Sequence, residues 1–90
     1  MVNPSIASQL ISEETDEIGL WVIVYDFRGF KPNPNFWANL RRISSSYGGY
    51  LIQYSVYQAE NKSEAEAISS LVRHYGGEAK AFECKEPTNS

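Results

Sequence analysis

The tripeptide Tyr-Gly-Gly occurs twice in this chain, at residues 47–49 and 75–77. Each copy follows a stretch with helical periodicity and precedes a stretch rich in strand-forming residues. Glycine accepts the left-handed conformation that ends many helices, so each copy is expected to close a helix and open a strand. With a strand at the front of each half, this weak repeat predicts the element order β-α-β, β-α-β.

The first half of the chain contains a strand signal followed by a helix signal. Residues 20–25 form a continuous apolar and β-branched run, LWVIVY, which is typical of a central strand covered on both faces. Asn33 followed by Pro34 is a good helix start, because Asn caps free N–H groups and proline fits the first helical position. One face of the expected helix carries apolar side chains at helical spacing, namely Phe36, Leu40, Ile43 and Tyr47.

The second half repeats this pattern. Residues 50–59 are rich in strand formers and are best divided into two short strands that meet near Tyr54 and Ser55. Ser63 and Glu66 have the spacing of a capping box, in which each side chain binds a free backbone N–H of the first helical turn. The helix that follows is expected to bury Ile68, Leu71, Val72 and Tyr75. Residues 78–84 predict a last strand with Phe82 as its main core anchor.

These elements predict an α+β fold of the ferredoxin-like βαββαβ type, a four-stranded antiparallel sheet with two helices on one face. The other face would need a partner or solvent-tolerant side chains. We divide the chain into a flexible acidic leader at 1–17, the ferredoxin-like domain at 18–86 and a tail at 87–90. The apolar run at 6–11 could instead form a helical turn that docks on the domain. Because a domain of this size buries a limited core, we expect a homodimer.

The cellular compartment is predicted from what the sequence lacks. Cys84 is the only cysteine and cannot form an internal disulfide, and the N-terminus shows neither the basic start nor the apolar run of a signal peptide. The apolar run at 20–25 is too short to span a bilayer. We therefore expect a soluble cytoplasmic protein without a membrane partner. His74 has no Cys or His at zinc-ligand spacing, and no phosphate loop, nucleophile elbow or dinucleotide fingerprint is present.

Charge is distributed unevenly along the chain. The leader holds four acidic residues and no Lys or Arg, whereas residues 20–59 hold four basic residues and a single acidic one. The basic residues could contact nucleic-acid phosphates, or they could form an ordinary solvated helix face. They are Arg28, Lys31, Arg41 and Arg42.

Two segments resemble a known protein family. Residues 22–26, VIVYD, resemble the first strand of CRISPR-associated adaptation subunits, the small endoribonuclease-like partners of the spacer integrase. Residues 52–57, IQYSVY, resemble that family's second motif, in which an apolar residue and Gln precede a Ser-Val-aromatic sequence. The resemblance covers residues 20–84, although Gln58 and Ala59 stand where the family often has Glu-Gly. The virulence-associated protein D family, which has the same fold, is the second choice.

Asp26 is the candidate catalytic residue. It is the only carboxylate between Glu17 and Glu60, and it stands where the first strand opens into a loop. Such a carboxylate could bind Mg²⁺ through oxygen, or it could cap the amides of the loop as a structural residue. The resemblance implies the first role, with two copies of Asp26 meeting across a dimer axis and with Tyr25 and Ser55 orienting the site.

Three functions fit these observations. By resemblance we expect a nucleic-acid-associated homodimer of CRISPR-associated antiviral defence, with a spacer integrase as its partner. It would hold duplex DNA mainly as a scaffold, with weak or absent Mg²⁺-dependent nuclease activity. The alternatives are a non-catalytic ferredoxin-like interaction module and a toxin-type endoribonuclease. Tyr54 and Tyr57 would stack on bases if they lay on an open sheet face, and would otherwise belong to a core.

Overall fold

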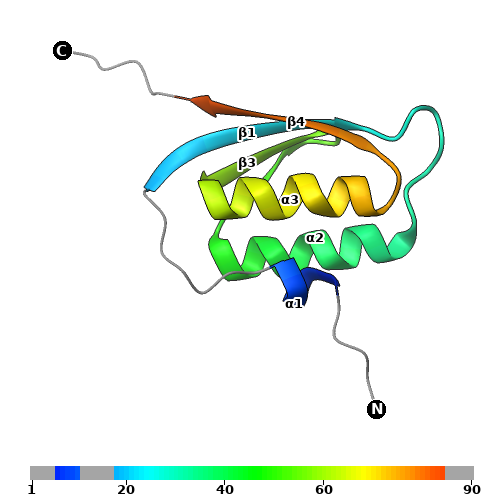
Figure 1. Ribbon diagram of the computed structural model, residues 1–90, viewed down its shortest axis with the longest axis horizontal. Helices are drawn as coiled ribbons and strands as arrows, with labels where there is room; N and C mark the ends of the chain where they lie inside the picture. Colours follow the sequence, from blue (N-terminus) through cyan, green and yellow to red (C-terminus); the bar gives the residue numbers. More distant parts are fainter. Residues whose placement is uncertain (1–5, 11–17, 85–90) are drawn as a thin grey trace.

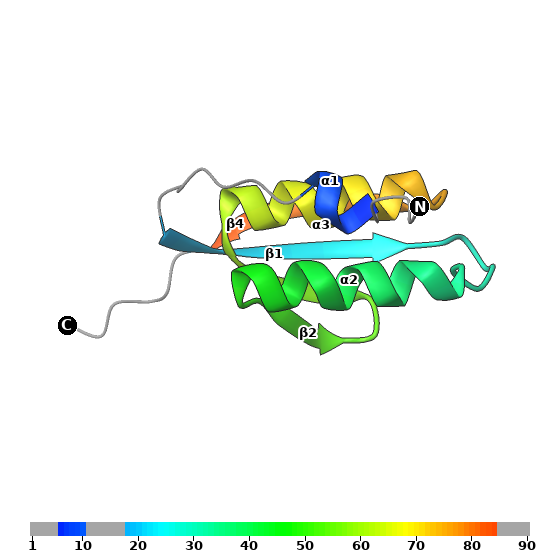
Figure 2. The ribbon, with the colours of Figure 1, turned by 90° about the horizontal axis from the view of Figure 1, so that it is seen from below.

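The computed structural model describes residues 6–10 and 18–84. Its four strands form one antiparallel sheet in the order β2-β3-β1-β4, and helices α2 and α3 lie side by side on one face of that sheet (Figures 1 and 2). The predicted α+β, ferredoxin-like fold is therefore confirmed. The elements are α1 (Ile6–Leu10), β1 (Ile18–Asp26), α2 (Pro34–Tyr47), β2 (Tyr50–Gln53), β3 (Val56–Asn61), α3 (Lys62–His74) and β4 (Glu78–Cys84).

The two Tyr-Gly-Gly copies perform the same structural task. The first glycine of each copy has a positive φ, +102° at Gly48 and +89° at Gly76, which turns the chain out of the helix. The second glycine of each, Gly49 and Gly77, has no room for a side chain, because a Cβ there would lie under 3.0 Å from neighbouring atoms. At Gly77 these atoms include the carbonyl oxygen of Asp26, so this glycine lets the start of β4 pack tightly against the end of β1.

Helix α2 begins as the sequence predicts. The side chain of Asn33 accepts a hydrogen bond from the backbone N–H of Asn35 at 2.8 Å. The expected apolar stripe faces the core, with Phe36, Leu40 and Ile43 buried and Tyr47 partly buried against it.

The capping box predicted at Ser63 and Glu66 is wrong. Strand β3 continues to Asn61, so α3 begins directly after it, and Asn61 is the cap. Its side chain accepts from the backbone N–H of Glu64 at 2.8 Å, and Glu64 Oε1 accepts from the backbone N–H of Glu60 at 2.7 Å. The capping pair is therefore Asn61 and Glu64, and Glu66 is exposed.

Glu64 is also a buried polar group that joins several elements of the domain. Its side chain is fully buried, and its Oε2 accepts from the backbone N–H of Gly49 at 2.9 Å and from the Tyr57 hydroxyl at 2.5 Å. Burial raises the pKa of the Glu64 carboxyl. This one carboxylate therefore ties the start of β2, the strand β3 and the first turn of α3 together.

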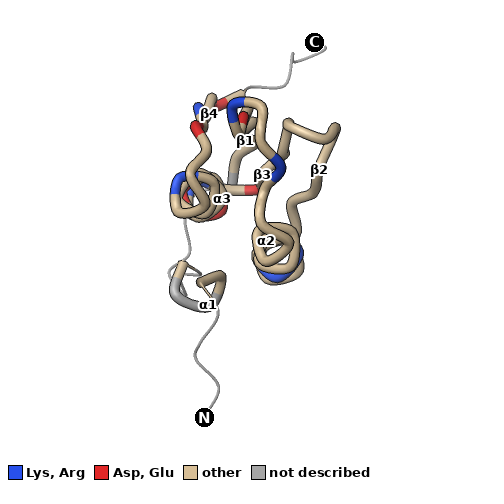
Figure 3. The backbone as a smooth tube through the Cα atoms, turned by 90° about the vertical axis from the view of Figure 1, so that its right-hand side faces the viewer, with Lys and Arg blue, Asp and Glu red and all other residues tan. Residues whose placement is uncertain are grey.

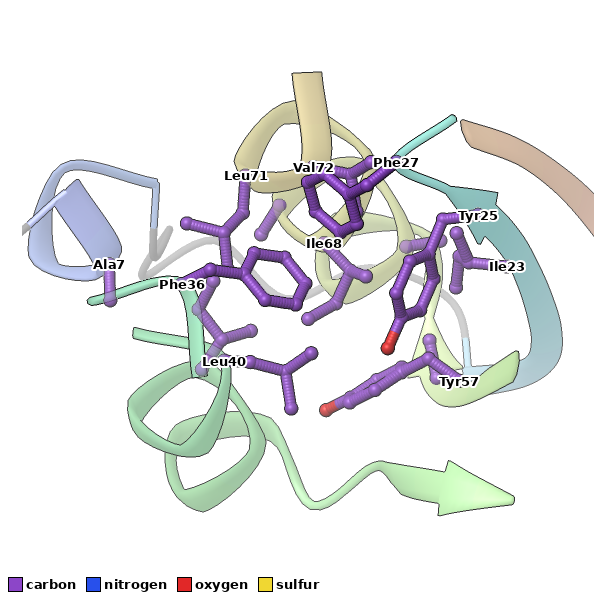
Figure 4. Close-up of a cluster of buried hydrophobic side chains, with 14 residues drawn as sticks. Ala7, Ile23, Tyr25, Phe27, Phe36, Leu40, Tyr57, Ile68, Leu71 and Val72 are labelled. Carbon is purple, nitrogen blue, oxygen red and sulfur yellow. The ribbon is translucent and has the colours of Figure 1, made fainter. Parts of the chain in front are cut away.

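The hydrophobic core lies between the sheet and the two long helices (Figure 4). Tyr25 and Phe27, at the end of β1 and just after it, meet Phe36 of α2 edge to face, with ring centroids 5.7 and 4.9 Å apart. Ile68, Leu71 and Val72 of α3 are fully buried among them, as the helical periodicity predicts. The closing Tyr75 packs partly buried beside this cluster.

Strand β1 is not covered on both faces, and this corrects the prediction made for residues 20–25. Ile23 and Tyr25 point into the core, whereas Val24 lies on the opposite face and is 45% exposed. Phe82 of β4 pairs with Val22 on that same face and is 52% exposed, so it is not the core anchor that was predicted. Both faces of β1 therefore carry apolar side chains, but one face packs in the core and the other is partly exposed.

Part of the predicted leader belongs to the folded structure. Residues 6–10 form the short helix α1, which packs against α2 and α3 on the side away from the sheet (Figure 3). Ala7 is fully buried, and its backbone N–H donates to Asn39 Oδ1 at 2.9 Å. The remaining leader residues, including its four carboxylates, and the tail at 87–90 lie outside the described residues.

Candidate functional site

Asp26 is the last residue of β1, and its side chain is exposed. It alternates with Val22 and Val24, so it belongs to the face of the sheet that no helix covers. Its cross-strand partner is Glu78, the first residue of β4, which the sequence analysis did not single out. Because directly opposed side chains lie close together, this end of the sheet gathers two carboxylates.

Arg28 partly neutralises this acidic end. Its Nε lies 2.5 Å from Glu78 Oε2, and the hydrogen bond and charge of Arg28 lower the pKa of the Glu78 carboxyl. Both side chains are largely exposed, so the pair contributes little to stability. Arg28 adopts a positive φ of 54°, which is uncommon for a residue with a side chain. This predicted nucleic-acid contact is thus engaged with Glu78.

A hollow of about 290 Å³ lies beside Asp26, between the loop that follows β1 and the turn that joins β2 to β3. We call it the loop–turn hollow. It is lined by Tyr25, Asp26, Phe27, Gly29, Phe30, Lys31, Pro32, Tyr54 and Ser55.

Tyr25 holds the two sides of the loop–turn hollow together. Its backbone N–H donates to the carbonyl oxygen of Ser55 at 3.0 Å, and its hydroxyl donates to the carbonyl oxygen of Tyr54 at 2.8 Å. Burial raises the pKa of the Tyr25 hydroxyl, so this group stays protonated and acts as a fixed donor. The expected proximity of Tyr25 and Ser55 to Asp26 is therefore present in the structure.

The basic residues do not form one patch. Lys31 lines the loop–turn hollow with Asp26, whereas Arg41 and Arg42 are exposed on α2. Figure 3 shows basic residues on the outer side of α2, away from the sheet. The structure thus brings Lys31 to Asp26 and leaves the two arginines on a different surface.

Few side chains that could bind a metal ion lie near Asp26 in the described part of the chain. Within residues 6–10 and 18–84, no three His, Cys, Asp or Glu side chains gather in a way that could hold a metal ion. Among the described residues that line the loop–turn hollow, Asp26 is the only carboxylate. A Mg²⁺ ion there would have a single carboxylate ligand, Asp26, from one chain. Its other ligands would have to be water molecules or groups from a second copy of the chain.

The two tyrosines considered for base stacking have different environments. Tyr57 is fully buried and donates its hydroxyl to Glu64, so it belongs to the core. Tyr54 is 70% exposed in the β2–β3 turn, and its ring packs against Trp37 of α2 at 5.1 Å between centroids. Tyr54 therefore stays available to a ligand, at the rim of the loop–turn hollow.

The uncovered side of the sheet is a second candidate surface, which we call the open sheet face. Cross-strand pairing places Val56 beside Val24, and Gln58 and Phe82 on either side of Val22. Most of these side chains are apolar and partly or largely exposed. The open sheet face consists of Val22, Val24, Tyr50, Gln53, Val56, Gln58, Lys80 and Phe82.

A larger hollow of about 460 Å³ lies beside α3, with Trp21, Ser69 and Ala81 among its lining residues. We place the candidate site at the smaller loop–turn hollow, because the predicted carboxylate Asp26 and the predicted cation Lys31 both line it. Comparison with known proteins finds no family model, no curated protein and no solved structure that matches this chain. Among the described residues, none of the helices has the length and apolar character needed to cross a membrane.

Proposed function

We propose that this chain is a cytoplasmic, nucleic-acid-associated protein that works as a homodimer joined through the open sheet face. The observation that carries the proposal is the separation of two surfaces. An apolar sheet face lies on one side of the domain, and exposed basic side chains lie on α2, on the opposite side. Packing two sheet faces together would leave the basic residues of both copies on the outside of the dimer.

The open sheet face suits a second protein chain better than it suits bases. Its centre is aliphatic, with Val22, Val24 and Val56 side by side, whereas sheets that bind single strands stack bases on central aromatic side chains. A second copy presents the same aliphatic centre across a two-fold axis. A standard interface of this kind removes about 800 Å² from each partner. For a small domain with a limited core, this burial adds substantially to stability.

Phosphate binding is assigned to Arg41, Arg42 and Lys31. None of the three has an acidic partner among the described residues, so their charges are available to a ligand. Phosphate contacts of this type give affinity but little sequence preference, which fits a scaffold. The resemblance of residues 22–26 and 52–57 to CRISPR-associated adaptation subunits supports the same class of function, with a spacer integrase as the proposed partner.

A metal-dependent nuclease activity is the further part of this proposal. Asp26 follows Val22 and Val24 on the open sheet face, so dimerisation through that face places a carboxylate of each copy at its border. Two such carboxylates would attract Mg²⁺, which supplies Lewis-acid chemistry and an activated water when bound. Tyr25 and Ser55 would hold the strand end in place.

The test combines self-association with binding. Sedimentation equilibrium of the full chain should show a dimer, and Val24→Asp should give a folded monomer, because a charge in the centre of the face opposes its burial. Gel shifts with duplex DNA should weaken steeply as salt rises. The double variant Arg41→Ala/Arg42→Ala should bind at least tenfold more weakly, and its matched control is Lys62→Ala/Arg73→Ala, which removes the same charge from α3.

The outcomes separate the candidate functions. A dimer that binds no nucleic acid at low salt would refute the proposal and leave the interaction module. Equal losses in the two double variants would refute the assignment of phosphate contacts to α2. Cleavage of RNA but not DNA, dependent on Mg²⁺ and on Asp26, would instead favour the toxin-type endoribonuclease.

A further inference from the structure

Two aromatic rings at the loop–turn hollow are exposed although large rings elsewhere in this region are buried. Phe30 is 51% exposed and Tyr54 is 70% exposed, whereas Tyr25 and Phe27 beneath them are in the core. Each exposed ring is supported from one side: Phe30 packs edge to face on Phe27 at 5.8 Å, and Tyr54 packs on Trp37. Supported rings with a free face are suitable platforms for a planar ligand, and stacking a base on one contributes about 1–3 kcal/mol.

The polar groups of the loop–turn hollow are few: the Tyr25 hydroxyl is already bonded to the Tyr54 carbonyl, and Asp26 interacts with the charge of Arg28. The carboxylate of Asp26 and the ammonium of Lys31 have no hydrogen-bond or ion-pair partner within residues 6–10 and 18–84. An aromatic hollow with a few convergent polar groups is the common form of a small-molecule site. The volume of about 290 Å³ suits one base with its sugar and is far too small for a base pair within a duplex.

The carboxylate selects among the four bases. An ionised carboxylate only accepts hydrogen bonds, and its two oxygens lie side by side. Guanine alone presents two adjacent donors, N1–H and the N2 amino group, on its Watson–Crick edge. The corresponding edges of adenine, cytosine and thymine or uracil each place at least one acceptor beside their donor, and that acceptor would face the carboxylate. A bidentate pair of this kind discriminates between bases by about 1–3 kcal/mol.

We infer that the loop–turn hollow binds one unpaired guanine, stacked by Phe30 and Tyr54 and read by the carboxylate of Asp26. Lys31 lies at the same hollow and neutralises the neighbouring phosphate. The inference rests on the proposed nucleic-acid association and narrows its ligand to a strand whose base is accessible. Asp26 acts here through hydrogen bonds, so binding requires no metal ion.

The test measures fluorescence anisotropy with short labelled oligothymidines in the presence of EDTA and at low salt. One probe carries a single central guanine, a second carries inosine, which lacks the N2 amino group, and a third carries 7-deazaguanine, which keeps both donors. The wild-type chain should bind the guanine and 7-deazaguanine probes alike and the inosine probe about tenfold more weakly. Tyr54→Ala should weaken the binding of all three.

The variant Asp26→Asn should bind all three probes with equal affinity, because the second acceptor is gone. Its matched control is Glu78→Gln, which removes the same charge from the opposed strand position outside the hollow and should keep the preference for guanine. Equal affinity of wild type for guanine and inosine probes, with binding intact, would overturn the inference and leave the proposed function standing. Failure to bind any oligonucleotide or duplex would overturn both.

Discussion

Replacing Glu64 by alanine would remove the acceptor that serves three donors at once. The carboxylate accepts from the backbone N–H of Gly49, the hydroxyl of Tyr57 and the backbone N–H of Glu60. Gly49 and Tyr57 are buried, so water cannot replace the lost acceptor there, and each unsatisfied donor costs about 1–3 kcal/mol. Glu60 is partly exposed and can bind water instead. The variant also no longer carries the cost of burying a carboxylate, which offsets part of this loss. We therefore expect a net decrease of about 3 kcal/mol in the unfolding free energy.

A loss of this size is large for a domain of this length. A chain of 90 residues has an unfolding free energy of about 5–10 kcal/mol, so the variant should fold but lose about a third or more of its stability. Urea denaturation followed by circular dichroism should show a lower midpoint with an unchanged slope. The melting temperature should fall by about 12–24 °C.

The matched control is Glu66→Ala, two residues further along the same helix. Glu66 is exposed and has no hydrogen-bond or ion-pair partner among the described residues, so its loss should change stability by less than about 0.5 kcal/mol. If the two variants lose the same stability, the network around Glu64 does not hold the fold, and the capping argument for Asn61 and Glu64 fails.

Three further results are expected. Burial holds the pKa of Glu64 above its ordinary value of 4.5, so the native chain keeps a proton that the unfolded chain releases. The unfolding free energy should therefore fall as pH rises from 4.5 through the raised pKa of the native chain. Glu64→Gln should abolish this fall, and an unchanged dependence of stability on pH in that variant would refute the assignment to Glu64. Gly77→Ala should cost about 2 kcal/mol because its Cβ would press on the end of β1, whereas Gly19→Ala, with open space around it, should be nearly neutral in the same melting experiment. Asp26→Asn should keep the fold by circular dichroism and remove any Mg²⁺-dependent cleavage of DNA; an unfolded variant would show that Asp26 is a structural cap.

Signals that act within one or two helical turns were predictable from the sequence. Asn33 and Pro34 start α2, and the two Tyr-Gly-Gly copies end helices and open strands, because caps and left-handed turns depend on neighbours along the chain. The failed capping box shows the limit of such reasoning. Asn61 with Glu64 and Ser63 with Glu66 have the same spacing, and the choice depends on two donors outside the helix, the backbone N–H of Gly49 just before β2 and the hydroxyl of Tyr57 in β3.

The apolar run of β1 shows a second limit. A strand that is apolar on both faces is expected either between two covering layers or between a core and an interface. The amino-acid sequence of the strand looks alike in the two cases. Its neighbours carry the missing information: Gln58 and Lys80 are polar and share a face with Val22 and Val24. Polar residues beside an apolar strand indicate a face that no helix covers, but the register that places them there is set by tertiary pairing.

The candidate site could be predicted only in part for the same reason. Asp26 is visible in the sequence as an isolated carboxylate at a strand end, and Lys31 as one of four basic residues. Phe30 and Tyr54 come from segments far apart in the chain, and the hydrogen bond from Tyr25 to the Tyr54 carbonyl joins those segments. No spacing rule within a single sequence relates the two rings.

Asp26 connects the two surfaces that carry the proposals. It continues the alternation of Val22 and Val24 on the open sheet face, and it also lines the loop–turn hollow. Its backbone carbonyl is held against Gly77 at the start of β4. A second copy that packed on the open sheet face would therefore press on the same strand whose last residue we propose to read the base. Under both proposals, dimerisation and base recognition would be coupled through the end of β1, so a variant that blocks dimerisation, such as Val24→Asp, should also change the affinity for the guanine probe.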